Sequence, residues 1–247
     1  NHSVRITTNN DSNDGFEERL VPYESIVYPD DADLFIHIPD SDEAQKAVSF
    51  VRALPSNLTE LKLTVSTGRV VGFRTKDNLK EKVSDKTIPL IYPYHFKQGK
   101  MIWPSTNNKN NAILKNEKTL NLLIPSGIYV LVKRFSSKEE KRRVVASLLT
   151  PSIVKSEFYG IDNKLNYFHV DGQGLDSLLA KGLVLYLNSS IVDKAFRQFS
   201  GHTQVNATDL RKMNYPNRDQ LISMGRRYNK NLMSQEVIDE TVLEILD

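Results

Sequence analysis

The sequence predicts an α+β fold, in which a mostly antiparallel or mixed β-sheet is followed by helices at the C-terminal end. Strand-like segments succeed one another between residues 61 and 170, and helix-like segments succeed one another after residue 174. This grouping is typical of α+β proteins. A doubly wound parallel sheet would instead require strands and helices to alternate along the chain.

The N-terminal part predicts short elements. Val4–Thr8 and Leu20–Val27 have the β-branched character of strands, and residues 33–38 predict a third strand. Ser41 or Asp42 is expected to cap a helix that follows. Apolar residues recur at helical spacing in it: Ala44, Ala47, Val48 and Val51.

The middle of the chain predicts the sheet. Leu61–Val71 alternates like a strand and is broken near Gly68, which permits a tight turn or a close backbone approach. A turn at Gln98-Gly99 predicts a hairpin between flanking apolar segments, and Tyr92–His95 is interpreted as a strand edge. Further strands are expected at residues 129–135, at 144–149 and around Tyr167, the last after a turn at 160–163.

From residue 174 the pattern becomes helical. Gly174–Leu187 predicts an apolar helix, and Ser189 or Ser190 can cap the next one, which ends near Phe199. Asn206 can cap a short helix with Asp209 in a capping-box position. Pro216 limits that helix, and residues 235–246 predict an amphipathic closing helix.

The net charge of +3 conceals an uneven distribution. Residues 1–68 hold 5 Lys/Arg against 12 Asp/Glu, a net charge of −7. Residues 69–143 hold 17 against 6, a net charge of +11, and residues 144–247 hold 11 against 12. A basic middle third indicates a face that binds a polyanion, although a solvated lysine-rich surface would have the same composition.

Composition also excludes several classes of protein. The chain has no cysteine, which excludes a disulfide scaffold and a cysteine-based zinc site and fits a cytoplasmic location. The five histidines show no metal-binding spacing, and no stretch is long and apolar enough to span a membrane. Because the chain begins at Asn1 rather than at Met, we expect it to be either a fragment of a longer protein or a processed form.

Several motifs together resemble a known family. They read Leu187-Asn188-Ser189-Ser190, Phe196-Arg197 and Ser200-Gly201-His202-Thr203-Gln204-Val205-Asn206, with an upstream block at residues 65–74. The stretch that contains them resembles the C-terminal target recognition portion of N6-adenine DNA methyltransferases of the TaqI-like gamma class, from restriction–modification systems. The resemblance implies a tail of a preceding catalytic domain at residues 1–56, a recognition domain at 57–219 and a helical segment at 220–247.

The family's catalytic motifs are missing from this chain. We find neither a glycine-rich turn for S-adenosylmethionine nor an Asn-Pro-Pro-Tyr-type motif for adenine, and Asp171–Gly174 predicts only a turn. The resemblance therefore implies a specificity module with no cofactor site of its own. Its partners would be double-stranded DNA and a catalytic domain, in a parent enzyme that methylates a flipped adenine with S-adenosylmethionine.

Candidate DNA contacts are cations and amides, because cations suit phosphates and Arg, Asn and Gln suit base edges. We predict DNA binding by Arg69, Arg74, Lys76, Lys97, Lys133, Arg134, Lys141, Arg142, Arg143, His202, Thr203 and Gln204. Other roles stay open: a solvated loop for residues 138–143, a structural ion pair for Arg134, and backbone hydrogen bonding for His202. Asn206 is expected to be the helix cap, and Trp103 to belong to the core.

Two other classes of function remain as alternatives. Asp30, Glu60 and Lys62 match the spelling of a metal-dependent nuclease, in which carboxylates hold magnesium and lysine orients the nucleophile. A charged chain produces such a match easily by chance. The other alternative is a non-catalytic assembly module that binds a protein partner through its C-terminal helix.

Overall fold

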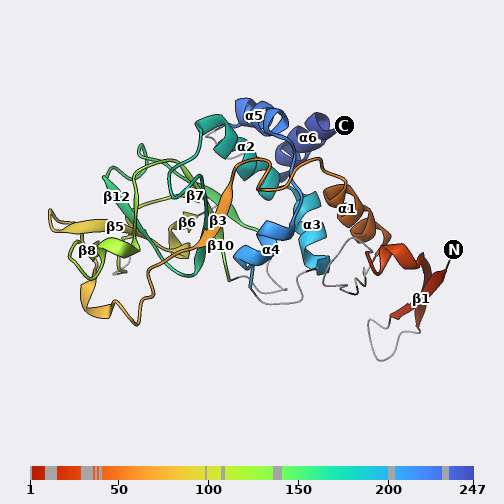
Figure 1. Cartoon of the computed structure of the whole chain (residues 1–247), viewed down its shortest axis with the longest axis horizontal. Helices are drawn as coiled ribbons and strands as arrows, with labels where there is room; N and C mark the ends of the chain where they lie inside the picture. The colour runs from red at the N-terminus through yellow and green to blue at the C-terminus, as the bar shows by residue number, and fades with distance from the viewer. Residues whose placement is uncertain are drawn as a thin grey trace.

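The computed structural model describes residues 2–8, 16–28, 36, 38, 41–97, 99–106, 109–135, 141–199, 204–229 and 234–247. In this part of the chain the two larger sheets lie at one end of the molecule and the helices gather at the other (Figure 1). The predicted α+β class is confirmed.

The sheet next to the helices has four antiparallel strands. Their order is β11 (Ala146–Leu149), β10 (Tyr129–Lys133), β13 (Leu165–His169) and β3 (Thr64–Thr67). Val130 of the central strand β10 lies opposite Leu148 on one side and Phe168 on the other. The register therefore aligns apolar side chains across the sheet, where they form one continuous face.

The second sheet has five short strands. Their order is β4 (Leu79–Lys80), β8 (Ala112–Leu114), β5 (Thr87–Ile91), β12 (Phe158–Ile161) and β9 (Leu123–Pro125). Only the β5–β12 pair is parallel. Two hairpins complete the strands: β1 (Ser3–Thr8) with β2 (Glu17–Pro22), and the predicted one, β6 (Phe96–Lys97) with β7 (Lys100–Met101).

Strand β10 separates the two main cores, because successive side chains of a strand point to opposite faces. Val130 and Val132 face the helices and belong to the larger core, together with Phe168. Tyr129 and Leu131 face the second sheet and pack in the core between the sheets. All four side chains of β10 named here are fully buried.

Six helices are described: α1 (Asp42–Arg52), α2 (Ser177–Leu187), α3 (Ser190–Phe199), α4 (Ala207–Lys212), α5 (Arg218–Arg227) and α6 (Gln235–Leu246). The apolar helix α2 packs against strands β10 and β11, and α5 packs along α2 (Figure 1). Ser41 caps α1 by accepting the Ala44 N–H at 3.1 Å, as predicted. Val48 and Val51 of α1 join the same core as α2, so the boundary expected at residue 56 crosses this core.

Several local predictions were wrong. Residues Tyr23–Ser25 and Pro93–His95 form 3-10 helices where strand was expected. Residues 158–161 form strand β12, so the turn falls at 162–164 instead of 160–163. The backbone of β12 pairs with strands from distant parts of the chain, which local patterns do not reveal. The strand expected at 33–38 lies almost wholly outside the described residues. Two further short 3-10 helices cover Lys76–Asn78 and Leu120–Leu122.

Glycines allow helices α2 and α5 to touch backbone to backbone. A Cβ added to Gly182 would lie 1.8 Å from the Leu221 carbonyl oxygen. A Cβ added to Gly225 would lie 2.0 Å from the Leu178 carbonyl oxygen. The two contacts are reciprocal and fix both the spacing and the register of the helix pair.

We therefore expect Gly182→Ala to destabilise the fold by about 3 kcal/mol, because α5 must move away from α2 and open the core. Gly72→Ala is the matched control, since no atom lies within 4 Å of its added Cβ. It should change the free energy of unfolding by less than about 0.5 kcal/mol. Urea denaturation measures both, and equal midpoints for the two variants would contradict the close helix contact.

Candidate nucleic-acid interface

The Asn188-Ser189-Ser190 motif joins the helices to the sheet. The Asn188 side chain accepts the Ala146 N–H at 3.0 Å and donates to the Ala146 carbonyl oxygen at 2.9 Å. Ala146 opens the edge strand β11, so one side-chain amide replaces the neighbouring strand that this residue lacks. Asn188 follows the last residue of α2, and the bond therefore fixes the end of that helix on the sheet edge.

Asp193 and Arg142 complete this junction. One oxygen of Asp193 accepts the N–H groups of Arg143 at 2.6 Å and Val144 at 3.1 Å, and the other accepts from Arg197 Nε at 2.9 Å. The Arg142 guanidinium donates to the carbonyl oxygens of Asn188 and Ser189 and to Gln235 Oε1. Burial lowers the pKa of Arg142, opposed by the Asp193 charge.

These contacts correct the prediction that residues 141–143 bind phosphate together. Arg143 is fully buried and Arg142 is half-buried against backbone carbonyls, so neither side chain is placed for DNA. Lys141 is exposed and remains a candidate. The sequence does not reveal the difference, because the groups that enclose Arg142 and Arg143 lie about 50 residues away in the chain. Lys138 lies outside the described residues.

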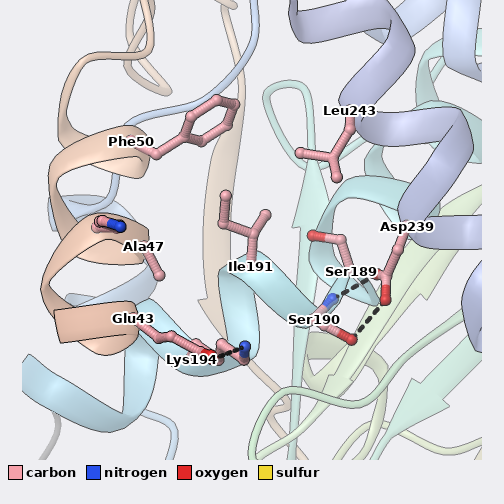
Figure 2. Close-up of a pocket in the computed structure, with 10 residues that line it drawn as sticks. Glu43, Ala47, Phe50, Ser189, Ser190, Ile191, Lys194, Asp239 and Leu243 are labelled. Atoms are coloured by element: carbon pink, nitrogen blue, oxygen red, sulfur yellow. Dashed lines mark hydrogen bonds and ion pairs between the residues drawn. The ribbon is translucent and has the colours of Figure 1, made fainter. Parts of the chain in front are cut away.

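A cleft of about 460 Å³ lies beside this junction, between helices α1, α3 and α6 (Figure 2). Its polar floor is already bonded: Asp239 accepts the Ser190 N–H and Oγ–H at 2.6 Å each and the Gln235 amide at 2.9 Å. Phe50, Ile191 and Leu243 line the apolar part. The Asp239 carboxylate therefore caps the start of α3.

The segment after residue 203 is attached to the end of strand β10. Val205 donates its N–H to the Arg134 carbonyl oxygen at 2.7 Å, and Gln204 forms an antiparallel bridge with Phe135. The buried Asn166 amide donates to the Val205 carbonyl oxygen at 2.7 Å. Two stretches predicted independently as DNA contacts, at 133–134 and at 202–204, thus meet through Gln204. His202 and Thr203 themselves lie outside the described residues.

Asn206 takes the structural role predicted for it. It forms a capping box with Asp209 at the start of α4, and Asp209 accepts the Asn206 N–H at 3.0 Å. Arg211 of the same helix donates to the Val65 carbonyl oxygen of strand β3 at 2.8 Å. The segment therefore leaves the sheet at Val205 and returns to it one helix later, which fixes where Gln204 lies.

The turn at residues 162–164 connects two further predicted segments. Arg134 donates its backbone N–H to the Lys164 carbonyl oxygen at 2.9 Å and its guanidinium to the Asn163 carbonyl oxygen at 3.2 Å. On the other side, Asn163 donates its N–H to the Val70 carbonyl oxygen at 2.8 Å. A Cβ on Gly68 would lie 2.1 Å from the Asp162 carbonyl oxygen, so only glycine permits this approach.

Backbone bonds therefore bring these segments together at the turn, and we call their predicted cations and amide, with Lys164, the turn face. It comprises Arg69, Arg74, Lys76, Arg134, Lys164 and Gln204. Arg69, Arg74, Lys76 and Lys164 are exposed, whereas Arg134 and Gln204 are half-buried. The sequence predictions included all of these residues except Lys164. That residue was missed because the turn was placed too early, within what is strand β12.

Two ionisable groups, Asp162 and His169, are buried near the two ends of strand β13. Burial raises the pKa of Asp162, opposed by the backbone N–H of Lys164, which donates to its carboxyl at 3.0 Å. Burial lowers the pKa of His169, and so does the positive charge of Arg69. His169 Nδ1 accepts the Gly172 N–H at 3.0 Å, and Nε2 lies 2.9 Å from Ser66 Oγ. A neutral His169 therefore acts as a structural link between strands β13 and β3.

Two other predicted cations, Lys97 of strand β6 and Lys133 of strand β10, lie at the β6–β7 hairpin. Lys97 is exposed, and the Lys133 ammonium lies 5.8 Å from the centre of the Phe96 ring. Lys133 therefore points toward the hairpin rather than toward the turn face. Trp103 is half-buried against the core between the sheets and donates its indole N–H to the Asn111 carbonyl oxygen at 3.3 Å. Its predicted core role is confirmed.

The nuclease pattern does not form a site in the part of the chain that the structure describes. The Glu60 carboxylate accepts the Asn57 N–H at 2.9 Å, as a turn cap does, and Lys62 has a φ of 56°. Asp30 lies outside the described residues. Among those that are described, no three His, Cys, Asp or Glu side chains lie close enough to hold a metal ion. The helices described are all too short or too polar to cross a membrane.

Comparisons with known proteins agree with the resemblance in part. The chain is 46% identical over 227 residues to the type II methyltransferase M.PstI of Providencia stuartii, and 47% identical over 230 residues to the type II methyltransferase M.BsuBI of Bacillus subtilis. Its homologues are type II methyltransferases. The alignments cover 92% and 91% of this chain but only 45% of each relative, so the chain spans less than half of their length.

Two other comparisons add little. No family model matches the chain. A solved structure of the type IIG restriction endonuclease BpuSI aligns with 83% of this chain and 33% of that protein, at 12% identity and a TM-score of 0.47. The identity and the score are both too low for this likeness to bear on the site.

The junction yields a test of which basic residues are structural. Arg142→Ala should lower the free energy of unfolding by about 3 kcal/mol, because two backbone carbonyls lose a charged donor. Lys141→Ala, the adjacent control, should change it by less than about 0.5 kcal/mol. Urea denaturation followed by circular dichroism measures both. A fully stable Arg142→Ala variant would make Arg142 a candidate for DNA binding again.

Proposed function

We propose that this chain is the DNA-binding target recognition module of a type II, adenine-N6-specific DNA methyltransferase. The observation that carries the proposal is the turn face, whose exposed cations belong to segments that backbone bonds bring together at the 162–164 turn. The homology to type II methyltransferases supports DNA as the polyanion. The motifs quoted above support the recognition role and the gamma class.

The chemistry of the turn face favours phosphate contact. Among the described residues, no carboxylate forms an ion pair with Arg74, Lys76 or Lys164. Exposed cations of this kind release counterions from DNA when they neutralise phosphates. Gln204 adds an amide that suits the paired acceptor and donor of adenine in the major groove. The backbone bonds around Val205 fix the main chain that carries this amide at the end of strand β10.

The methyl transfer itself is assigned to the rest of the parent enzyme. S-adenosylmethionine and the flipped adenine would bind in a catalytic domain outside this chain, which carries neither of the family's catalytic motifs. The module would hold the duplex against that domain. A cytoplasmic location, where the DNA lies, is part of this proposal.

The salt dependence of the affinity for duplex DNA tests the proposal that the turn face binds phosphates. The triple variant Arg74→Ala/Lys76→Ala/Lys164→Ala should bind all duplex sequences more weakly. It should reduce the slope of log affinity against log salt by about 2 to 3, which is near 0.9 for each phosphate that the variant no longer neutralises. Anisotropy titrations of a fluorescent duplex at several salt concentrations measure both quantities.

The control removes the same charge from the helical end. Lys181→Ala/Arg218→Ala/Arg226→Ala changes cations of α2 and α5 and should leave affinity and slope close to those of the parent chain. Equally weakened binding in both triple variants would mean that net charge alone governs binding. That result would contradict the proposal that the turn face binds DNA. Magnesium-dependent plasmid cleavage that disappears in Glu60→Ala would favour the nuclease alternative. Binding only to a protein, unaffected by salt, would favour the assembly module.

A further inference from the structure

An aromatic side chain stands out from the turn face. Among the described residues, no large hydrophobic side chain is more exposed than Phe73, at 80%. Its neighbour Arg74 and the nearby cations Arg69 and Lys76 are exposed as well. Single exposed hydrophobic residues are common on protein surfaces and need no explanation by themselves. The backbone around Phe73 makes this one different.

Phe73 lies at the tip of a turn that is fixed at both ends. Before it, Val70 is fully buried and donates its N–H to the Ile161 carbonyl oxygen at 2.9 Å. After it, Thr75 is buried, and its N–H and Oγ–H both donate to the Val71 carbonyl oxygen at 3.1 Å. The Arg74 N–H donates to the same oxygen at 2.9 Å. The phenyl ring is therefore held out in solvent by a backbone with little freedom to withdraw it.

The side chains around the ring complement it. The Arg74 guanidinium lies 5.4 Å from the centre of the Phe73 ring, on the same turn. Arg69 Nη1 donates to the Asn121 carbonyl oxygen at 3.3 Å, which fixes a second cation close to the base of the turn. An apolar tip between cations matches the cross-section of a duplex groove, where stacked bases lie between two phosphate backbones.

We propose that Phe73 is an apolar wedge that enters the base stack of bound duplex DNA, while Arg74 and Lys76 hold the flanking phosphates. This inference rests on the proposed function. Extruding a base for chemistry requires that neighbouring bases unstack. Apolar side chains inserted between base steps supply this unstacking in other DNA-binding proteins, and a preorganised backbone reduces the entropy lost on insertion.

The chain contains a matched comparison. Phe16 is 74% exposed, nearly as much as Phe73, but it lies in the N-terminal segment whose net charge is −7. The DNA phosphates should repel the acidic residues around Phe16, which keeps this phenyl ring away from the duplex. Phe16→Ala therefore removes the same side chain at similar exposure without touching the wedge.

The experiment begins with a duplex selected from a random pool by the wild-type chain. Copies of it carry 2-aminopurine at successive positions, since the fluorescence of this base rises when it unstacks. The wild type should raise the fluorescence at one or two adjacent positions. Phe73→Ala should abolish this rise and weaken binding about 10- to 100-fold, as expected for the removal of one stacking aromatic. Phe73→Trp should retain the rise, and Phe16→Ala should match the wild type in both measurements.

The possible results of this experiment test the Phe73 wedge and the proposed DNA-binding function separately. A wild-type chain that selects and binds no duplex overturns the proposed function and the wedge with it. A chain that binds with the expected salt dependence, but without any fluorescence rise or with the same rise in Phe73→Ala, overturns the wedge alone. Weaker binding by Phe73→Ala without any unstacking by the wild type would assign Phe73 to a groove contact instead and also overturn the wedge. Urea denaturation should show unchanged stability of Phe73→Ala, because the side chain is exposed in the free protein.

Discussion

The junction between the backbone of residues 143–146 and the side chains of Asn188 and Asp193 holds the helical and sheet parts together. Three backbone N–H groups and one carbonyl in this stretch are bonded to these two side chains. The N–H groups of Arg143 and Val144, as buried donors, would each cost about 1–3 kcal/mol if left unsatisfied. Helix α2 and helix α3 meet at this point, so their positions on the sheet depend on the same few bonds. The Asn188-Ser189-Ser190 motif therefore has a structural role at this junction.

A second constraint builds the candidate site. The 162–164 turn offers backbone groups on two sides, and it receives Arg134 on one and the strand around Val70 on the other. Segments separated by about 60 residues therefore share a surface whose geometry is set by main-chain bonds. Gly68 is required because a side chain there would strike the Asp162 carbonyl. A movement of this backbone would separate the basic residues that it carries.

Much of the fold was predictable because its signals are local. The caps of Ser41 and Asn206 and the bounds of helix α6 follow from capping chemistry and helical periodicity within a few residues. The burial of Arg142 and Arg143 and the strand at 158–161 were not predictable, because they depend on partners far away in the sequence. The candidate site was predictable only as separate segments. Neither Lys164 nor the exposure of Phe73 has a sequence signal of its own.

The fold shows that the basic residues of positions 69–143 do not all contribute to one surface. Of the 17 Lys/Arg residues between 69 and 143, Arg142 and Arg143 serve the junction, and Lys133 points toward Phe96. Lys164 lies outside that third, yet the turn brings it to the turn face. The electrostatic potential that attracts a polyanion therefore depends on which cations are exposed at the surface. It depends much less on the number of Lys and Arg residues in the sequence. Because the Arg74 guanidinium lies beside the exposed Phe73 ring, attraction of the phosphates and contact with the bases would occur at the same place.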